Sequence, residues 1–114
     1  MTAVTQPDWQ AICQRDDLVA GGGVCALLGQ EHVALFYLPA QERSLYALGN
    51  YDPIGCASVL SRGIVGSIGE RLVVASPLYK QHFDLVTGEC LEEASAAVPV
   101  YEVRLDGDSV LIRG

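Results

Sequence analysis

Four side chains that can take part in acid–base or nucleophilic chemistry lie within seven residues of each other. The stretch SPLYKQH contains Ser76, Tyr79, Lys80 and His82, which supply a hydroxyl, a phenol, an amine and an imidazole. The sequence around them predicts extended chain, in which adjacent side chains point to opposite faces, so Tyr79 and Lys80 would not converge. No acid that could orient one of these groups is identifiable. We therefore do not expect independent catalysis here.

Length and charge predict one acidic domain over residues 1–114. Half of the residues are apolar and 18% are charged, which is typical of a compact globular chain. Fourteen acidic residues against seven basic ones give a net charge of −7, and Lys80 is the only lysine. Because nucleic-acid affinity depends on several Lys and Arg side chains that neutralise phosphates together, we expect no nucleic-acid partner.

The first residues and the cysteines predict a cytoplasmic location. MTAVTQPDWQ has neither a basic nor an apolar region of a signal peptide, and no later apolar run has the length of a membrane span, so we expect no membrane partner. Four scattered cysteines, Cys13, Cys25, Cys56 and Cys90, favour reduced and mostly buried thiols over a disulfide framework. Their role is not predicted.

Short apolar segments between turn signals predict an all-β fold. WQAIC (9–13) is the first expected strand, and VCALLG (24–29), HVALFYL (32–38) and LYALGN (45–50) follow as hairpins in series or a meander. His32 opens one of these strands without a second imidazole nearby, which favours a partly buried strand-end histidine over a metal ligand.

The C-terminal segment predicts a closing hairpin, and the middle of the chain predicts irregular structure. VYEVRL and DSVLIR flank Asp106 and Gly107, a strong two-residue turn signal, and Tyr101, Val103 and Leu105 alternate with polar residues. Residues 50–69 contain five glycines or prolines without steady alternation. Long irregular segments inside compact domains are usually functional or remnants of a function.

This order of elements resembles the Rieske-like fold over nearly the whole chain, as an antiparallel β sandwich or barrel. LYALGN leads into a Pro/Gly loop, RLVVA leads into SPLYK, and HFDLVTGECL follows, so residues 50–91 correspond to the cluster-binding loop region. In Rieske proteins each of two loops gives one cysteine and one histidine to a [2Fe–2S] cluster. The first pair aligns with Asn50 and Asp52, and the second with Ser76 and Tyr79. The resemblance therefore implies that all four ligands are replaced.

Hard oxygen and amide donors do not substitute for soft thiolates, so we expect no cluster, no cofactor and no metal on this chain. Asn50 and Asp52 can instead bond backbone N–H groups, and the Tyr79 ring can fill the vacated space while its hydroxyl finds a polar partner. An alternative uses shifted ligands, Cys56, His82 and Cys90, in an unconventional electron-transfer ferredoxin. We favour loops that hold themselves without metal.

Several phrases are similar to the small subunit of the cytoplasmic NAD(P)H-dependent assimilatory nitrite reductase. They are Asp52-Pro53, Ser61-Arg62-Gly63 and SPLYKQ at 76–81. The resemblance implies a non-catalytic accessory subunit bound to a large subunit that carries FAD, an iron–sulfur cluster and sirohaem and reduces nitrite to ammonium. It leaves open regulation, stabilisation or channelling, the stoichiometry and the choice between NADH and NADPH. A stand-alone binding module is a further alternative.

The tip formed by the two loops is the expected docking surface. It would present Arg62, Tyr79 and Lys80 on an otherwise acidic protein, and Tyr and Arg are favoured at binding centres. The alternative, that Arg62 and Lys80 are simply solvated, stays open.

Overall fold

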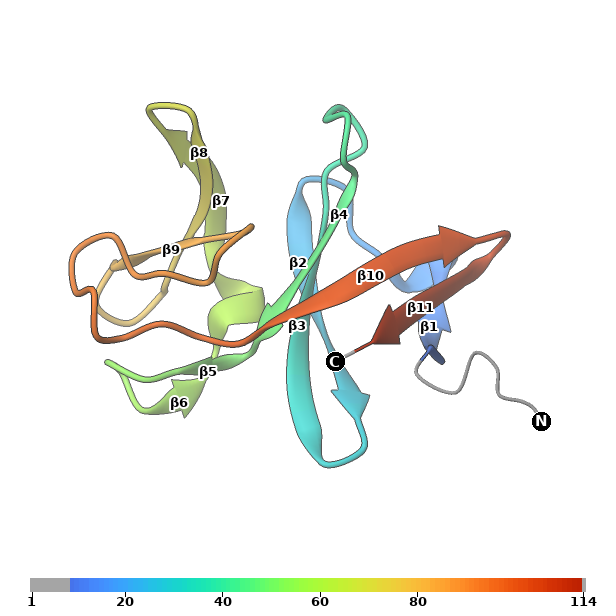
Figure 1. Cartoon of the computed structure of the whole chain (residues 1–114), viewed down its shortest axis with the longest axis horizontal. Helices are drawn as coiled ribbons and strands as arrows, with labels where there is room; N and C mark the ends of the chain where they lie inside the picture. The colour runs from blue at the N-terminus through green and yellow to red at the C-terminus, as the bar shows by residue number, and fades with distance from the viewer. Residues whose placement is uncertain (1–8, 114) are drawn as a thin grey trace.

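The largest element of the computed structural model, which describes residues 9–113, is a six-stranded antiparallel sheet (Figure 1). Its strands lie in the order β1-β11-β10-β4-β3-β2, and β1 approaches β2, so that the sheet is nearly closed into a barrel. They are β1 (Gln10–Gln14), β2 (Gly22–Leu28), β3 (Glu31–Tyr37), β4 (Leu45–Gly49), β10 (Val100–Asp106) and β11 (Ser109–Arg113). The predicted all-β class and the meander of β2, β3 and β4 are confirmed.

A smaller part, made from the middle of the chain, lies beside the barrel strands in Figure 1. It contains a three-stranded antiparallel sheet and a short hairpin. The sheet is formed by β7 (Ile64–Ile68), β8 (Arg71–Ala75) and β9 (His82–Asp84), and the hairpin by β5 (Tyr51–Asp52) and β6 (Ala57–Ser58). Two single 3-10 turns, η2 (Arg15–Asp17) and η3 (Leu60–Arg62), complete the described elements. Within residues 9–113 no helix is long and apolar enough to cross a membrane.

Strands β3 and β4 separate two hydrophobic cores. Successive side chains of a strand point to opposite faces, so Val33 and Leu35 pack inside the barrel while Ala34 and Phe36 face the smaller part. Strand β4 is buried at all five positions for the same reason. The outer face of these strands packs against Leu60 of η3 and the β8 and β9 region. The β5–β6 hairpin and the loop after β8 therefore lie in a part of the chain that packs against the buried strands β3 and β4.

Three details differ from the sequence-based expectations. Asp106 pairs with Ser109, so the closing turn consists of Gly107 and Asp108 rather than Asp106 and Gly107; Gly107 takes the positive φ of +63° that suits glycine. Strand β7 was not expected, because Gly66 interrupts its apolar pattern and most of its side chains are exposed. His32 is exposed rather than partly buried, because it lies beside the β2–β3 turn.

Candidate functional site

Asp52 and Ser76 connect the β5–β6 hairpin, which we call the first loop, with the segment that follows β8, which we call the second loop. The Ser76 hydroxyl donates a hydrogen bond of 2.5 Å to Asp52 Oδ2, although the two residues are 24 positions apart. Asp52 Oδ1 accepts from the N–H groups of Ile54 and Gly55 at 2.8 and 3.0 Å. Both Asp52 and Ser76 are completely buried. The predicted turn at Asp52 is thus confirmed, and its carboxylate also ties the second loop.

Asn50 holds the segment that follows the first loop. Its Oδ1 accepts a 2.7 Å hydrogen bond from the N–H of Ser61 in η3, and its Nδ2 donates to Cys25 Sγ at 3.5 Å. The side chain is 2% exposed. Asn50 therefore bonds a backbone N–H group as predicted, but eleven residues away rather than within its own turn.

The second loop closes on itself and packs on the first. The N–H of Ser76 donates to the carbonyl of Gln81 at 2.9 Å, and the N–H of Lys80 donates to the carbonyl of Ser76 at 3.1 Å. Lys80 takes a left-handed conformation, with φ of +66°. Leu78 covers Gly55 so closely that a Cβ there would lie 2.3 Å from Leu78 Cδ1. The loops thus touch through an apolar contact as well as a hydrogen bond.

The prediction that Tyr79 fills the space between the loops is wrong. Tyr79 is 66% exposed, so its ring is not buried between the loops. Asp52 and Ser76 bond directly to each other, and Leu78 supplies the apolar contact that was assigned to the Tyr79 ring. Tyr79 is consequently available at the surface.

Arg62 and Lys80 are brought together, as the docking prediction requires. Both line a small cavity of about 110 Å³, together with Ile64 and Pro77. Ile64 is 74% exposed, and Leu78, one residue from Tyr79, is 43% exposed. The loop end therefore carries two basic side chains beside exposed apolar ones, which we call the tip surface (Arg62, Ile64, Leu78, Tyr79 and Lys80).

An ion-pair network supports the hairpin after the second loop, and the sequence analysis did not identify it. Asp84 is buried, accepts from the N–H groups of Val86 and Thr87 at 2.7 and 3.0 Å, and forms a 2.6 Å ion pair with Arg71. Burial raises the pKa of Asp84, but the Thr87 N–H and the Arg71 guanidinium outweigh it, and the pKa lies below its ordinary value. Arg71 also pairs with Glu89 at 2.9 Å.

His82 is held by Glu92, a carboxylate that the sequence analysis did not identify as its partner. The carboxylate of Glu92 accepts from the His82 backbone N–H at 2.8 Å and contacts its Nδ1 at 2.5 Å. The hydrogen bond from the His82 N–H, followed by the interaction with its ring, lowers the pKa of Glu92. The cluster of chemical groups from Ser76 to His82 is therefore split, because Ser76 is buried against Asp52 and His82 is bound to Glu92.

The four cysteines are unpaired, but the prediction that most are buried is wrong. Cys90 is buried and Cys13 half-buried, whereas Cys25 and Cys56 are exposed. Burial, with Asp17 nearby, raises the pKa of the Cys13 thiol. Cys25 lies on the outer face of an edge strand and Cys56 in the first loop, which explains their exposure. Within residues 9–113 no three His, Cys, Asp or Glu side chains are grouped to hold a metal ion.

Comparison with known proteins identifies the family. Residues 8–113 match the model of the Rieske-like [2Fe-2S] domain. The nitrite reductase (NADH) small subunit of Salmonella typhimurium is 45% identical over 106 residues, which cover 93% of this chain and 97% of that protein. The chain belongs to this Rieske-like nitrite reductase small-subunit family. The solved structure of the Escherichia coli protein NirD has a TM-score of 0.83 and 43% identity, with 93% and 96% of the two chains covered.

Two further matches are a longer protein that contains a similar segment and a solved structure with a similar fold. The nitrite reductase [NAD(P)H] large subunit of Klebsiella oxytoca is 37% identical over 110 residues. These residues cover 96% of the present chain but only 11% of the Klebsiella protein. The ferredoxin of carbazole 1,9a-dioxygenase from Nocardioides aromaticivorans has a TM-score of 0.77 at 24% identity, with 92% and 96% of the chains covered. That likeness shows the Rieske-like fold alone.

Proposed function

We propose that this chain is the accessory small subunit of an NAD(P)H nitrite reductase and that it docks on the large catalytic subunit without an active site of its own. The similarity to the Salmonella small subunit along nearly the full length of both proteins supports this. In the Klebsiella large subunit a similar segment is part of the large-subunit polypeptide itself. A domain that is joined covalently to a large subunit in one organism is suited to bind one as a separate chain in another.

We also propose that the chain binds no [2Fe–2S] cluster. The single observation that carries this is the direct hydrogen bond between Ser76 and Asp52, because it uses two of the four positions at which the family places ligands. Asn50 is bonded to Ser61, and Tyr79 points outward. Amide, carboxylate, hydroxyl and phenol groups are hard donors, whereas the cluster needs soft thiolates and imidazoles. These residues do not fit the cluster.

In this account the large subunit carries FAD, an iron–sulfur cluster and sirohaem, and reduces nitrite to ammonium. The small subunit supplies a rigid surface. The proposed complex reduces nitrite in the cytoplasm, where a reducing environment keeps the four cysteines unpaired.

The tip surface is the proposed docking site. Its exposed Tyr79 offers a large apolar area with a polar end, and Arg62 offers a planar donor, which are features of residues that dominate binding energy. The loops beneath are fixed by Asp52, Ser76 and Leu78, so binding does not have to order them. A preformed surface loses less conformational entropy on association.

The affinity of the purified chain for the purified large subunit tests this proposal. Tyr79→Ala and Arg62→Ala should each weaken binding by about tenfold or more, which corresponds to roughly 1.4 kcal/mol or more. Val19→Ala is the matched control, because Val19 is exposed on the barrel. Unchanged thermal unfolding would show that the variants are folded. Wild-type affinity in both tip variants would contradict docking through the tip.

The electron-transfer ferredoxin is not favoured by the same geometry. The shifted ligands it needs are Cys56, His82 and Cys90, but His82 Nδ1 contacts Glu92 and Cys90 is buried. The likeness to a solved ferredoxin concerns the fold alone. Iron analysis of the purified protein separates the two functions.

A further inference from the structure

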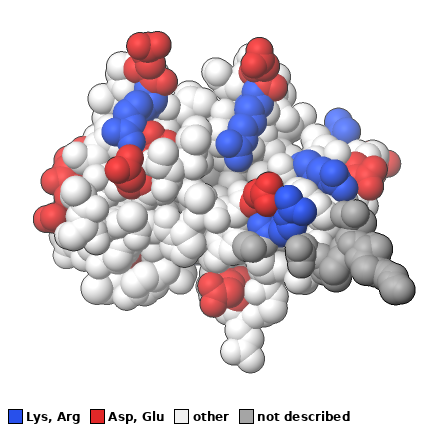
Figure 2. All heavy atoms as spheres, viewed as in Figure 1, with Lys and Arg blue, Asp and Glu red and all other residues white. Residues whose placement is uncertain are grey.

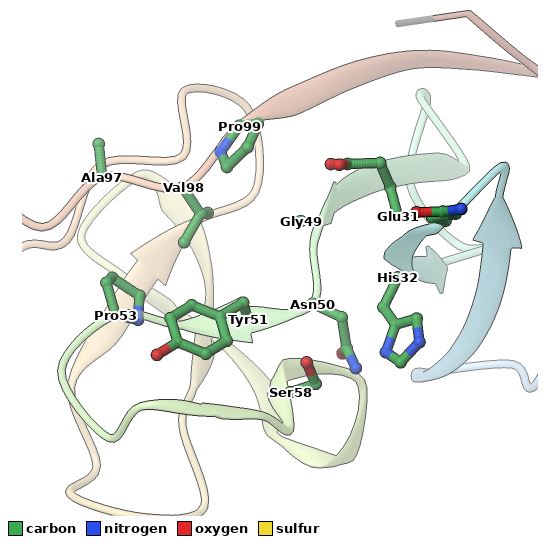
Figure 3. A pocket seen from close by; sticks show the side chains of 11 residues that line it. Glu31, His32, Gly49, Asn50, Tyr51, Pro53, Ser58, Ala97, Val98 and Pro99 are labelled. Atoms are coloured by element: carbon green, nitrogen blue, oxygen red, sulfur yellow. The ribbon is translucent and has the colours of Figure 1, made fainter.

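A second hollow lies on the other side of the first loop, and we call it the groove. Its volume is about 480 Å³, within the range of roughly 300–1,000 Å³ that is typical of ligand sites. Figure 3 shows Glu31 and His32 on one wall, Val98 and Pro99 on the opposite wall, and Tyr51 beside Pro53. The remaining lining residues are Gln30, Gly49, Asn50, Ser58 and Ala97.

The charge of the groove is negative and uncompensated. Glu31 is the only charged side chain among the lining residues when His32 is neutral, and no Lys or Arg lines the groove. Within residues 9–113 Glu31 forms no ion pair, and its only polar contact is a long hydrogen bond of 3.4 Å from the Tyr101 hydroxyl to Oε1. Figure 2 shows acidic colour at the β2–β3 turn and a face without charge over β5 and β6. A cation that enters the groove would therefore meet a carboxylate that has no basic partner within residues 9–113.

The second feature of the groove that would attract a cation is the Tyr51 ring. Tyr51 is 52% exposed although it precedes the buried Asp52, because the two residues of β5 point to opposite faces. Its ring lies in the groove between Pro53 and Asn50 (Figure 3). An aromatic face attracts a guanidinium group, and a carboxylate can bond it through two parallel N–H groups. Tyr51 and Glu31 together offer both interactions on different walls.

We propose that the groove binds an arginine side chain, with its flanking residues, from the large subunit. Charge complementarity supports this occupant, because a chain with net charge −7 favours a basic partner surface. Arginine fits better than lysine, since its planar group can stack on an aromatic ring such as that of Tyr51 or bond a carboxylate such as Glu31 through two parallel N–H groups. Val98, Pro99 and Pro53 provide apolar contacts for the neighbouring residues of the partner segment. The inference rests on the proposed function and adds a second contact to the tip surface.

The test measures the affinity of the purified chain for the purified large subunit at low and moderate salt. Glu31→Gln should weaken binding about tenfold, and it should reduce the loss of affinity that wild type shows when salt is raised. Tyr51→Leu, which keeps apolar volume without an aromatic face, should weaken binding roughly three- to tenfold. Glu42→Gln is the matched control, because Glu42 is an exposed acid in the loop between β3 and β4.

The outcomes separate this inference from the proposed function. Weakened binding of Glu31→Gln and Tyr51→Leu with wild-type binding of Glu42→Gln supports the groove. Wild-type affinity and salt dependence in both groove variants, while Tyr79→Ala binds weakly, would overturn the groove and leave docking at the tip intact. Absence of any binding by the folded wild-type chain would overturn the proposed function itself.

Discussion

Ser76 and Asp52 meet in the interior through a 2.5 Å hydrogen bond that connects two loops 24 residues apart. In our proposal these two positions correspond to cluster ligands of the Rieske pattern. Here the carboxylate also accepts two backbone N–H groups, from Ile54 and Gly55, so one side chain orders its own turn and the neighbouring loop. Ordering loops costs conformational entropy, which this network and the Leu78 contact help to offset.

Removal of either partner should destabilise the folded chain. Ser76→Ala leaves a buried carboxylate oxygen without its donor, and we expect a loss of about 1–3 kcal/mol in the free energy of unfolding. Asp52→Ala should cost more, because three donors lose their acceptor. Urea unfolding of both single variants and the double variant measures the coupling between them. Strictly additive losses would show that the two side chains do not interact.

Glycine is required at position 63 because the backbone of Ala75 leaves no space for a side chain there. A Cβ at this position would lie 2.4 Å from the carbonyl oxygen of Ala75, which is backbone and cannot turn away. Gly63→Ala should therefore lower the free energy of unfolding by about 1–3 kcal/mol. Gly66→Ala is the matched control on strand β7, because nothing lies within 4 Å of its Cβ position. Equal stability of the two variants would contradict the described packing.

The chain should lose stability in acid through Asp84 and Glu92. Their pKa values are lowered from ordinary values of 3.8 and 4.5, so each contributes stability that is fully present above these values. The contribution is lost as the pH falls through the lowered folded-state pKa values, because the unfolded chain then binds more protons. Urea unfolding between pH 2 and pH 7 measures this dependence.

Arg71→Ala should weaken that acid dependence and lower stability at neutral pH, since Arg71 pairs with Asp84 and Glu89. Arg62→Ala provides the control, because Arg62 makes no ion pair within residues 9–113. If both variants follow the wild-type curve, Arg71 does not lower the pKa of Asp84.

Thiol reactivity should follow exposure. Iodoacetamide at neutral pH should modify Cys25 and Cys56 in the native protein, and Cys13 more slowly because burial raises the pKa of its thiol. Cys90 should react only after unfolding. Peptide mapping by mass spectrometry follows each site. If Cys90 in the native protein were labelled as fast as Cys25, this would contradict the burial of Cys90 in the hydrophobic core.

The sequence predicted those parts of the fold that depend on local pattern. The runs from Val33 to Leu48 alternate between two buried faces, and the last two strands alternate around a glycine turn. Strand β7 was missed because Gly66 and exposed apolar side chains hide its period. Register within the closing turn was wrong by one residue, since both Asp-Gly and Gly-Asp suit a tight turn.

The candidate site was predicted in its positions but not in its contacts. Asn50, Asp52 and Ser76 lie at the loops as expected, whereas Leu78, to which no role was assigned, makes the apolar contact that was expected of Tyr79. Which of two adjacent loop side chains turns inward depends on the opposite loop, here on the space above Gly55. The Arg71–Asp84 pair likewise joins residues 13 positions apart. Such contacts follow from strand pairing and carry no local sequence signal.

The most direct test of the central claim is analysis of iron and acid-labile sulfide in protein purified anaerobically, with a visible absorption spectrum of the same sample. The account predicts colourless, folded protein without iron or sulfide, because Asp52, Ser76 and Leu78 hold the loops together. Stoichiometric iron and sulfide with visible charge-transfer bands would contradict it. Cys56, His82 and Cys90 would then have to be considered as ligands of an electron carrier.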